Sequence, residues 1–156
     1  MIEHHAGRPL SEAAIAEQLA IAPQFARASR MLGQLAGILL LVAGGGDPER
    51  QRTHLLVLKE QYEATCDAYR NLASPTELGP TFAAVAAVLR LIGAALQRLE
   101  HRAARPSAEG GLALLLAELG KARQILQTGS VPGLGLAVVD LTTSCCAAHV
   151  AQHGTT

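Results

Sequence analysis

The sequence predicts an all-α protein, a compact antiparallel bundle of five to six helices joined by mostly short connections. Three observations favour this fold class. Apolar residues recur in alternating steps of three and four, which is the spacing of one helix face. Short stretches rich in glycine, proline and serine separate these apolar stripes. No run of alternating β-branched residues is long enough to predict a strand, and residues 136–141 come closest to one.

The chain length is that of one domain. With 156 residues the protein is long enough to bury a hydrophobic core. Since we find no internal repeat and no low-complexity linker, we expect a single domain over residues 1–156. Within it, we expect residues 1–10 to form a flexible N-terminal segment.

The first two predicted helices meet at a proline. Ser11 is a capping residue for a short first helix, whose inward face consists of Ile15, Leu19 and Ala22. Pro23 either ends this helix or occupies the first turn of the next one. The second helix carries a long apolar stripe and ends at the three glycines 44–46. That stripe consists of Phe25, Ala28, Leu32, Leu35, Leu39 and Val42.

The third and fourth helices have clear boundaries. Asp47, Pro48 and Glu49 form a strong helix start, with a capping acid followed by proline in the first helical position. Ser74 and Pro75 end the third helix, and Thr76 or Thr81 can cap the fourth. The inward stripe of the third helix is Leu55, Leu58, Tyr62, Thr65, Tyr69 and Leu72. That of the fourth is Phe82, Val85, Leu89, Ile92, Leu96 and Leu99.

Two further helices are predicted in the last third of the chain. The fifth begins at Pro106 and Ser107 and ends at residues 128–130, with a stripe of Leu112, Leu115, Leu119, Ala122 and Leu126. The sixth covers roughly residues 134–152, and its inward residues are Leu134, Val138, Leu141 and Cys145.

The composition excludes several classes of protein. Apolar residues make up 49% of the chain and charged residues 17%, which argues against intrinsic disorder. The formal net charge is zero, so the chain has no clustered basic surface for nucleic acid. A neutral chain also does little to oppose self-association. All but two of the 13 basic residues are arginine, a bias that, with many alanines and glycines, indicates a bacterial source with a GC-rich genome.

We expect a cytoplasmic protein without a membrane span. The first residues lack the basic and apolar regions of a signal peptide, and three unevenly spaced cysteines do not suggest a disulfide scaffold. The uncharged run at residues 31–46 is shorter than the roughly 20 residues that a spanning helix needs. It therefore predicts a buried core helix that ends at the glycines.

The second helix also suggests an interface. Gly33 and Gly37 are four residues apart, which lets another helix approach closely, either within the bundle or from a second subunit. The run from Ile38 to Val42, which includes Leu41, is apolar on every side, so this helix is either central in the bundle or covered by a second subunit. Leu114, Leu115 and Leu116 form a similar run. Since a one-sided helix does not need this much apolar surface, the sequence predicts a homodimer or a complex with a helix of another protein.

A possible metal site lies near the C-terminal end of the sequence. Cys146, His149 and His153 share one face if this segment is helical, and thiolate and imidazole bind soft transition metals. The alternative interpretation is structural. Cys145 continues the apolar stripe, and both histidines are then solvated.

The sequence gives little support to an enzyme. It contains no phosphate-binding glycine loop, no nucleophile-elbow serine and no Glu-x-x-His pair for a di-iron site. Our expectation is therefore a non-catalytic interaction or regulatory protein that acts through self-association or partner binding. The alternative hypothesis is a sensor of a small molecule, a soft metal or redox state, which would use a pocket between helices or Cys146, His149 and His153.

Overall fold

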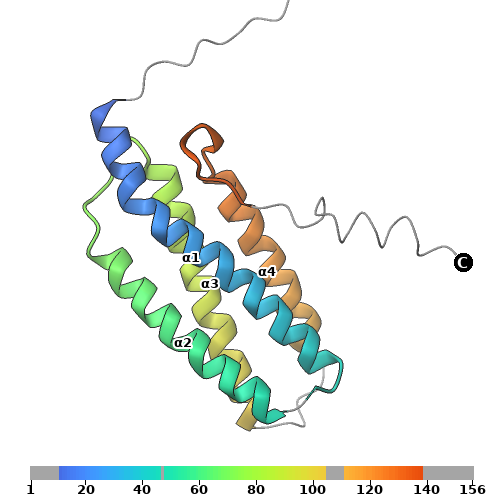
Figure 1. Cartoon of the computed structure of the whole chain (residues 1–156). Coiled ribbons are helices and arrows are strands. Elements are labelled where there is room, and N and C mark those ends of the chain that lie inside the picture. The colour runs from blue at the N-terminus through green and yellow to red at the C-terminus, as the bar shows by residue number, and fades with distance from the viewer. Residues whose placement is uncertain (1–10, 47, 105–110, 139–156) are drawn as a thin grey trace, which may run out of the picture.

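The computed structural model describes residues 11–46, 48–104 and 111–138. These ranges contain four α-helices followed by a short 3-10 helix, η1. Successive helices run in opposite directions, so the described chain forms an up-down-up-down bundle (Figure 1). The elements are α1 (Glu12–Ala43), α2 (Pro48–Arg70), α3 (Gly79–Ala104), α4 (Gly111–Thr128) and η1 (Pro132–Leu134).

Helices α1 and α3 are the central pair of the bundle. They contact each other, and α2 and α4 each pack against both of them. In Figure 1, α1 crosses the front of the bundle between α2 and α4, and α3 lies behind it. One long strip of α1 therefore faces away from the core, along the ridge between its two neighbours.

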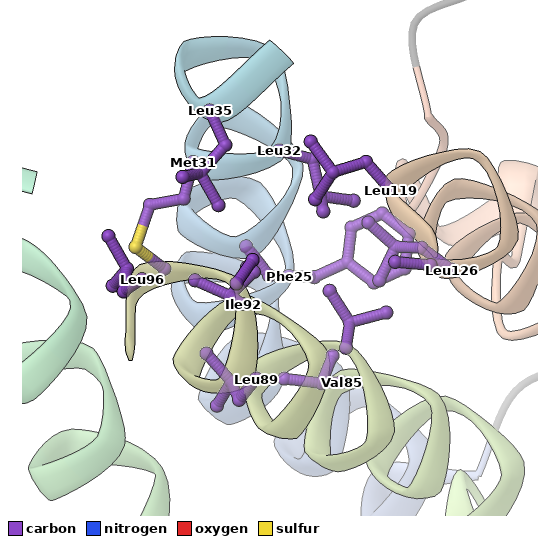
Figure 2. Packing of buried hydrophobic residues seen from close by; sticks show 14 of the residues in the cluster. Phe25, Met31, Leu32, Leu35, Val85, Leu89, Ile92, Leu96, Leu119 and Leu126 are labelled. Carbon is purple, nitrogen blue, oxygen red and sulfur yellow. The ribbon is translucent and has the colours of Figure 1, made fainter. Parts of the chain in front are cut away.

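The core consists of the stripes that the sequence predicts for α1, α3 and α4. Figure 2 shows side chains from these three helices packed together, with Phe25, Ile92 and Leu126 near the centre. All six predicted positions of α3 are buried, from Phe82 to Leu99. The three-four spacing is thus confirmed as the pattern that builds the core.

The predicted number of helices is wrong in the N-terminal part, because Pro23 does not interrupt α1. The helix runs through it for 32 residues. Pro23 is exposed, so its ring faces solvent, while Ile21 and Phe25 on either side are buried. The packing of these neighbours outweighs the hydrogen bond that proline removes from a helix interior.

Continuity through Pro23 also changes the inward face of the first helical turns. The predicted residues Ile15 and Leu19 point outward, and Leu19 is 69% exposed. Ala14 and Ile21 are buried instead. A continuous helix must keep the phase set by Phe25, and Ile21 lies one turn before Phe25 on the same face.

The predicted sixth helix does not begin at residue 134. Residues 131–136 form a tight loop around η1, in which Val131 pairs with Leu136 and the Val131 N–H donates to the Leu136 carbonyl over 2.7 Å. Gly135 has a φ of 72°, a left-handed conformation that glycine adopts without steric cost. Leu134 and Leu136 are buried, so this loop closes one end of the core. Leu141 and Cys145 lie outside the described residues.

The predicted cap of α1 is confirmed, whereas those of α3 are wrong. The Ser11 hydroxyl accepts a hydrogen bond from the Ala14 N–H at the start of α1. Thr76 instead donates its hydroxyl to Glu17 of α1 over 2.6 Å, and the Thr81 hydroxyl donates to the Gly129 carbonyl over 2.7 Å. Both threonines therefore link distant parts of the chain, which local sequence could not indicate. Of the other predicted boundaries, Pro48 begins α2, while Asp47, Pro106 and Ser107 lie outside the described residues.

Candidate functional site

The strip of α1 that faces away from the core is uncovered, and from Gly33 to Leu41 it is mostly apolar, with exposed Gln34 as its polar residue and exposed Arg30 one turn before it. We call Gly33, Gly37, Leu40 and Leu41 the outer face of α1. Leu40 is 63% exposed and Leu41 is 53% exposed. A Cβ atom built on Gly33 or Gly37 would meet no atom within 4 Å. Within the described residues, the two glycines therefore do not serve close packing of one helix on another.

The outer face continues sideways into a shallow groove between α1 and α2. This groove has a volume of about 280 Å³. Gly37 and Leu41 line it from α1, and His54 and Val57 line it from α2. Val57 is half exposed, as is its neighbour Leu56. Leu40 belongs to the run at residues 38–42 that is apolar on every side, whereas Val57 was not predicted as an exposed contact residue, because a stripe pattern does not show which apolar residues are left outside the bundle.

Two of the predicted interface residues do not belong to the outer face. Ile38 is only 6% exposed and is part of the core cluster, so it has little surface to offer a partner. Leu114 is 59% exposed but lies elsewhere on the bundle. It is one turn before Glu118 on α4, and Glu118 pairs with Arg98 of α3 over 2.5 Å. Leu114 therefore faces the α3 side of α4, away from the outer face of α1.

A second groove lies on the other side of the outer face, between α1 and α4. We call it the α1–α4 groove, and its volume is about 540 Å³. Its walls are mainly apolar, and small residues on both helices leave it open. Its lining residues from α1 are Ser29, Arg30, Leu32, Gly33 and Ala36, and those from the rest of the chain are Leu116, Leu119, Gly120, Arg123 and Val138. A volume of this size falls in the range of pockets that hold small molecules.

The predicted metal ligands Cys146, His149 and His153 all lie outside the described residues. Within the described ranges, no three His, Cys, Asp or Glu side chains come together as a metal site would require. Cys66 is a half-buried free thiol on α2. It lies beside Tyr62, where partial burial and a hydrogen bond with the thiol raise the pKa of the Tyr62 hydroxyl to about 12.

The most perturbed carboxylate of the described residues is Glu17. It accepts the Thr76 hydroxyl and the backbone N–H groups of Thr76 and Leu78, over 2.6–2.7 Å. The Thr76 hydroxyl and then these N–H groups lower the pKa of Glu17 to about 2. The carboxylate thus holds the chain that enters α3 against α1, which is a structural role.

Charged pairs on the surface tie neighbouring helices together. Lys59 of α2 and Glu100 of α3 are 2.7 Å apart, and the hydrogen bond with the carboxylate raises the pKa of Lys59. Arg98 and Glu118 link α3 to α4 in the same way. Both pairs are partly exposed, so solvent screens the attraction and each pair contributes little to stability. Neither pair lies on the outer face of α1.

Two described helices are long and apolar enough to cross a membrane, namely α1 and the part of α3 from Gly79 to His101. Their length and composition alone meet this test, and core helices of soluble bundles meet it as well. Residues 31–43 of the uncharged run are thus part of a longer helix than the sequence predicted.

Comparison of the chain with protein-family models, with curated proteins and with solved structures gives no match in any of the three. The surface and grooves of the bundle itself are therefore the features that point to a function.

Proposed function

We propose that this chain is a non-catalytic association module that forms a homodimer through the outer face of α1. The observation that carries the proposal is that this face is apolar, exposed and open. A contiguous apolar surface that faces solvent on a small domain is typical of a contact site.

A second copy is the favoured partner because the four residues of the outer face carry no charge, the nearest exposed charge on α1 being Arg30, one turn before Gly33. In a two-fold contact the same surface of both subunits meets itself, so any charge would lie near a like charge. Gly33, Gly37, Leu40 and Leu41 avoid this repulsion. Two α1 helices crossing at Gly33 and Gly37 would approach closely, and their leucines would bury each other.

Light scattering coupled to size-exclusion chromatography tests the proposal at micromolar concentration. We expect the native chain to elute with the mass of a dimer. Leu41→Glu should give a monomer, because it places two like charges in the contact. Leu114→Glu is the matched control, since Leu114 is equally exposed but lies on another side of the bundle. A native monomer, or two variants that behave alike, would refute the proposal, and circular dichroism verifies that both variants are folded.

We also propose that the protein works in a bacterial cytoplasm. The support for this comes from composition, with its bias toward arginine and its three cysteines without regular spacing. Fractionation of the native host into soluble and membrane fractions tests it, and recovery in the membrane fraction would contradict it. The same experiment also decides whether the long apolar helices α1 and α3 insert into a membrane.

A second candidate function, a small-molecule sensor, is favoured by the α1–α4 groove. Its volume and apolar walls suit an uncharged apolar ligand. A fluorescent apolar probe should bind the native chain, and a large side chain in the groove, as in Gly33→Leu, should abolish binding. For a soft metal, elemental analysis of the native chain and Cys146→Ser is the test, and a native protein without stoichiometric metal would exclude this form of the sensor.

A further inference from the structure

A further cleft between α1 and α2 contains two arginines. We call it the arginine cleft, and its volume is about 340 Å³. It follows the shallow groove beside the outer face toward the start of α1, and Gln61 lines both. The lining residues of the arginine cleft are Arg27, Arg30 and Met31 from α1 and Gln61, Ala64 and Thr65 from α2.

The arginine cleft has a buried floor and a polar rim. Met31 and Thr65 are each only 1% exposed, so they form the floor. Arg27, Arg30 and Gln61 are exposed and form the rim. The two arginines are three residues apart, which places both on the same side of α1. A molecule in the cleft therefore lies within reach of two guanidinium groups and one amide.

These arginines differ from the basic residues that link the other helices. Lys59 pairs with Glu100 between α2 and α3, and Arg98 pairs with Glu118 between α3 and α4. Among the residues that the structure describes, neither arginine of the cleft takes part in an ion pair.

Arg27 is held by a neutral neighbour. Its Nη1 atom donates to the side-chain oxygen of Gln24 over 3.4 Å, and Gln24 is itself buried. This contact orients Arg27 at the rim without balancing its charge.

Neighbouring acids are directed elsewhere. The α2 residues that line the cleft are uncharged, whereas Glu60, Glu63 and Asp67 on the same helix do not line it. Asp67 pairs with Arg70 over 2.9 Å. On α1, no acidic residue follows Glu17, and that carboxylate binds the chain before α3. The cleft thus concentrates positive charge, which favours a negatively charged ligand.

We propose that the arginine cleft binds a small molecule that carries a phosphate or carboxylate group. The guanidinium groups of Arg27 and Arg30 donate to its oxygens, since arginine forms paired hydrogen bonds with both kinds of group. Gln61 donates from the opposite helix. Met31 and Ala64 contact the uncharged part of the ligand, which must be short because the cleft is at the lower end of the range for small-molecule sites.

The proposed site is separate from those already described. Neither arginine belongs to the outer face of α1, so the proposal does not rest on the homodimer. Arg30 also lines the α1–α4 groove, but the anion lies on the α2 side of α1 and leaves that groove open to an apolar ligand.

Isothermal titration calorimetry of the full-length chain tests the proposal with two probes, inorganic phosphate and succinate. Sodium chloride keeps the ionic strength constant, so that screening by added salt is the same throughout. We expect at least one probe to bind saturably, one per chain, with a Kd on the order of 1 mM or below. The tighter probe shows whether the site prefers a phosphate or a carboxylate group.

Three variants locate the bound anion. Arg27→Gln and Arg30→Gln should each weaken binding by about tenfold or more, because each removes a charged donor. Gln61→Glu keeps both arginines and supplies a carboxylate from α2, so it should compete with the probe and abolish binding.

Arg90→Gln on α3 is the matched control. It removes the same charge from an exposed arginine, but the pocket beside Arg90 is also lined by Glu63 and Glu100. We therefore expect it to bind the probe as the native chain does. Circular dichroism verifies that all four variants are folded.

Three results would overturn the proposal. Titrations at two temperatures that show no saturable binding of either probe mean that the cleft is not an anion site. Binding that is unchanged in Arg27→Gln, Arg30→Gln and Gln61→Glu means that the anion lies elsewhere. An equal loss in Arg90→Gln means that only the net charge of the protein attracts the anion. None of these results concerns the mass of the native protein, so the homodimer is judged on its own.

Discussion

At the scale of single residues, the contact between the start of α3 and the end of α4 depends on a glycine. A Cβ atom on Gly129 would lie 2.4 Å from the Ala84 Cβ and 3.3 Å from the Thr81 Cα. The Thr81 hydroxyl also donates to the Gly129 carbonyl. The backbone of residue 129 can approach α3 this closely only because it carries no side chain.

Gly129→Ala is therefore predicted to destabilise the protein by about 1–3 kcal/mol, since backbone must move to accommodate the methyl group. Gly120→Ala is the control, because its Cβ meets open space in a helix interior. It should stabilise the protein by about 0.5–1 kcal/mol. Urea denaturation measures both free energies of unfolding, and a Gly129→Ala protein as stable as the native one would contradict the close contact.

Glu17 gives a prediction about pH. Its pKa is about 2 in the folded chain, against an ordinary value of 4.5 for a glutamate carboxyl. Because the folded pKa is depressed, the stabilisation is complete above pH 4.5 and is lost as the pH falls toward 2. Glu17→Gln should thus be less stable than the native chain at neutral pH, and the difference should vanish by about pH 2. Urea denaturation at several pH values measures this, with Glu60→Gln on α2 as a matched control. A difference that does not change with pH would argue against the hydrogen bonds of Glu17.

At the scale of elements, α1 is the helix in which packing overrides local preference. Its interior proline removes one backbone hydrogen bond, yet the helix continues for 32 residues. The buried residues of α1 before and after Pro23 lie on a single face of the helix, which includes Ile21, Phe25 and Ala28. Continuity makes α1 a single helix from Glu12 to the outer face.

Pro23→Ala should stabilise the protein by about 1–3 kcal/mol, since it restores a helical N–H donor at an exposed site. Pro75→Ala in the connection from α2 to α3 is the control. No helical hydrogen bond is regained there, and the unfolded chain gains freedom, so a small loss of about 0.4–1 kcal/mol is expected. Thermal and urea unfolding of both variants measure the effects. No gain from Pro23→Ala would mean that the helix is interrupted at this position.

At the scale of the whole molecule, the arrangement of helices decides which apolar residues remain available for contact. Because α1 packs against all three other helices, its outer face forms a ridge with a groove on either side. Figure 1 shows this ridge in front, between α2 and α4. The exposed apolar residues of the outer face thus lie together with both grooves on one side of the bundle.

If two copies associate through this ridge, the stability of the protein must depend on its concentration. The melting temperature of the native chain should rise by a few degrees between about 1 µM and about 100 µM, because dimerisation favours the folded state by mass action. Leu41→Glu should melt at one temperature over the same range, and Leu114→Glu should behave as the native chain does. Scanning calorimetry measures all three, and a native melting temperature independent of concentration would contradict an obligate dimer.

The sequence by itself determined what depends on neighbours within a few turns. The three-four stripes from Phe25 to Leu39, Phe82 to Leu99 and Leu115 to Leu126 are buried as predicted, and Ser11 caps α1. These features follow from helical periodicity and from hydrogen bonds between residues three apart. Both depend only on residues that are close together in the sequence.

Only the tertiary structure decided the rest, because it depends on which elements meet. Packing on both sides of Pro23 merges two predicted helices, and it turns Leu19 outward. Glu17 accepts hydrogen bonds from residues about 60 positions further along the chain. This contact, and not a threonine cap, fixes the backbone just before α3. Leu41 and Leu114 look alike in sequence, yet they lie on different sides of the bundle. Long-range contacts of this kind depend on the fold as a whole. Local periodicity marks the apolar residues that can be buried, but the packing of the assembled helices decides which of them are.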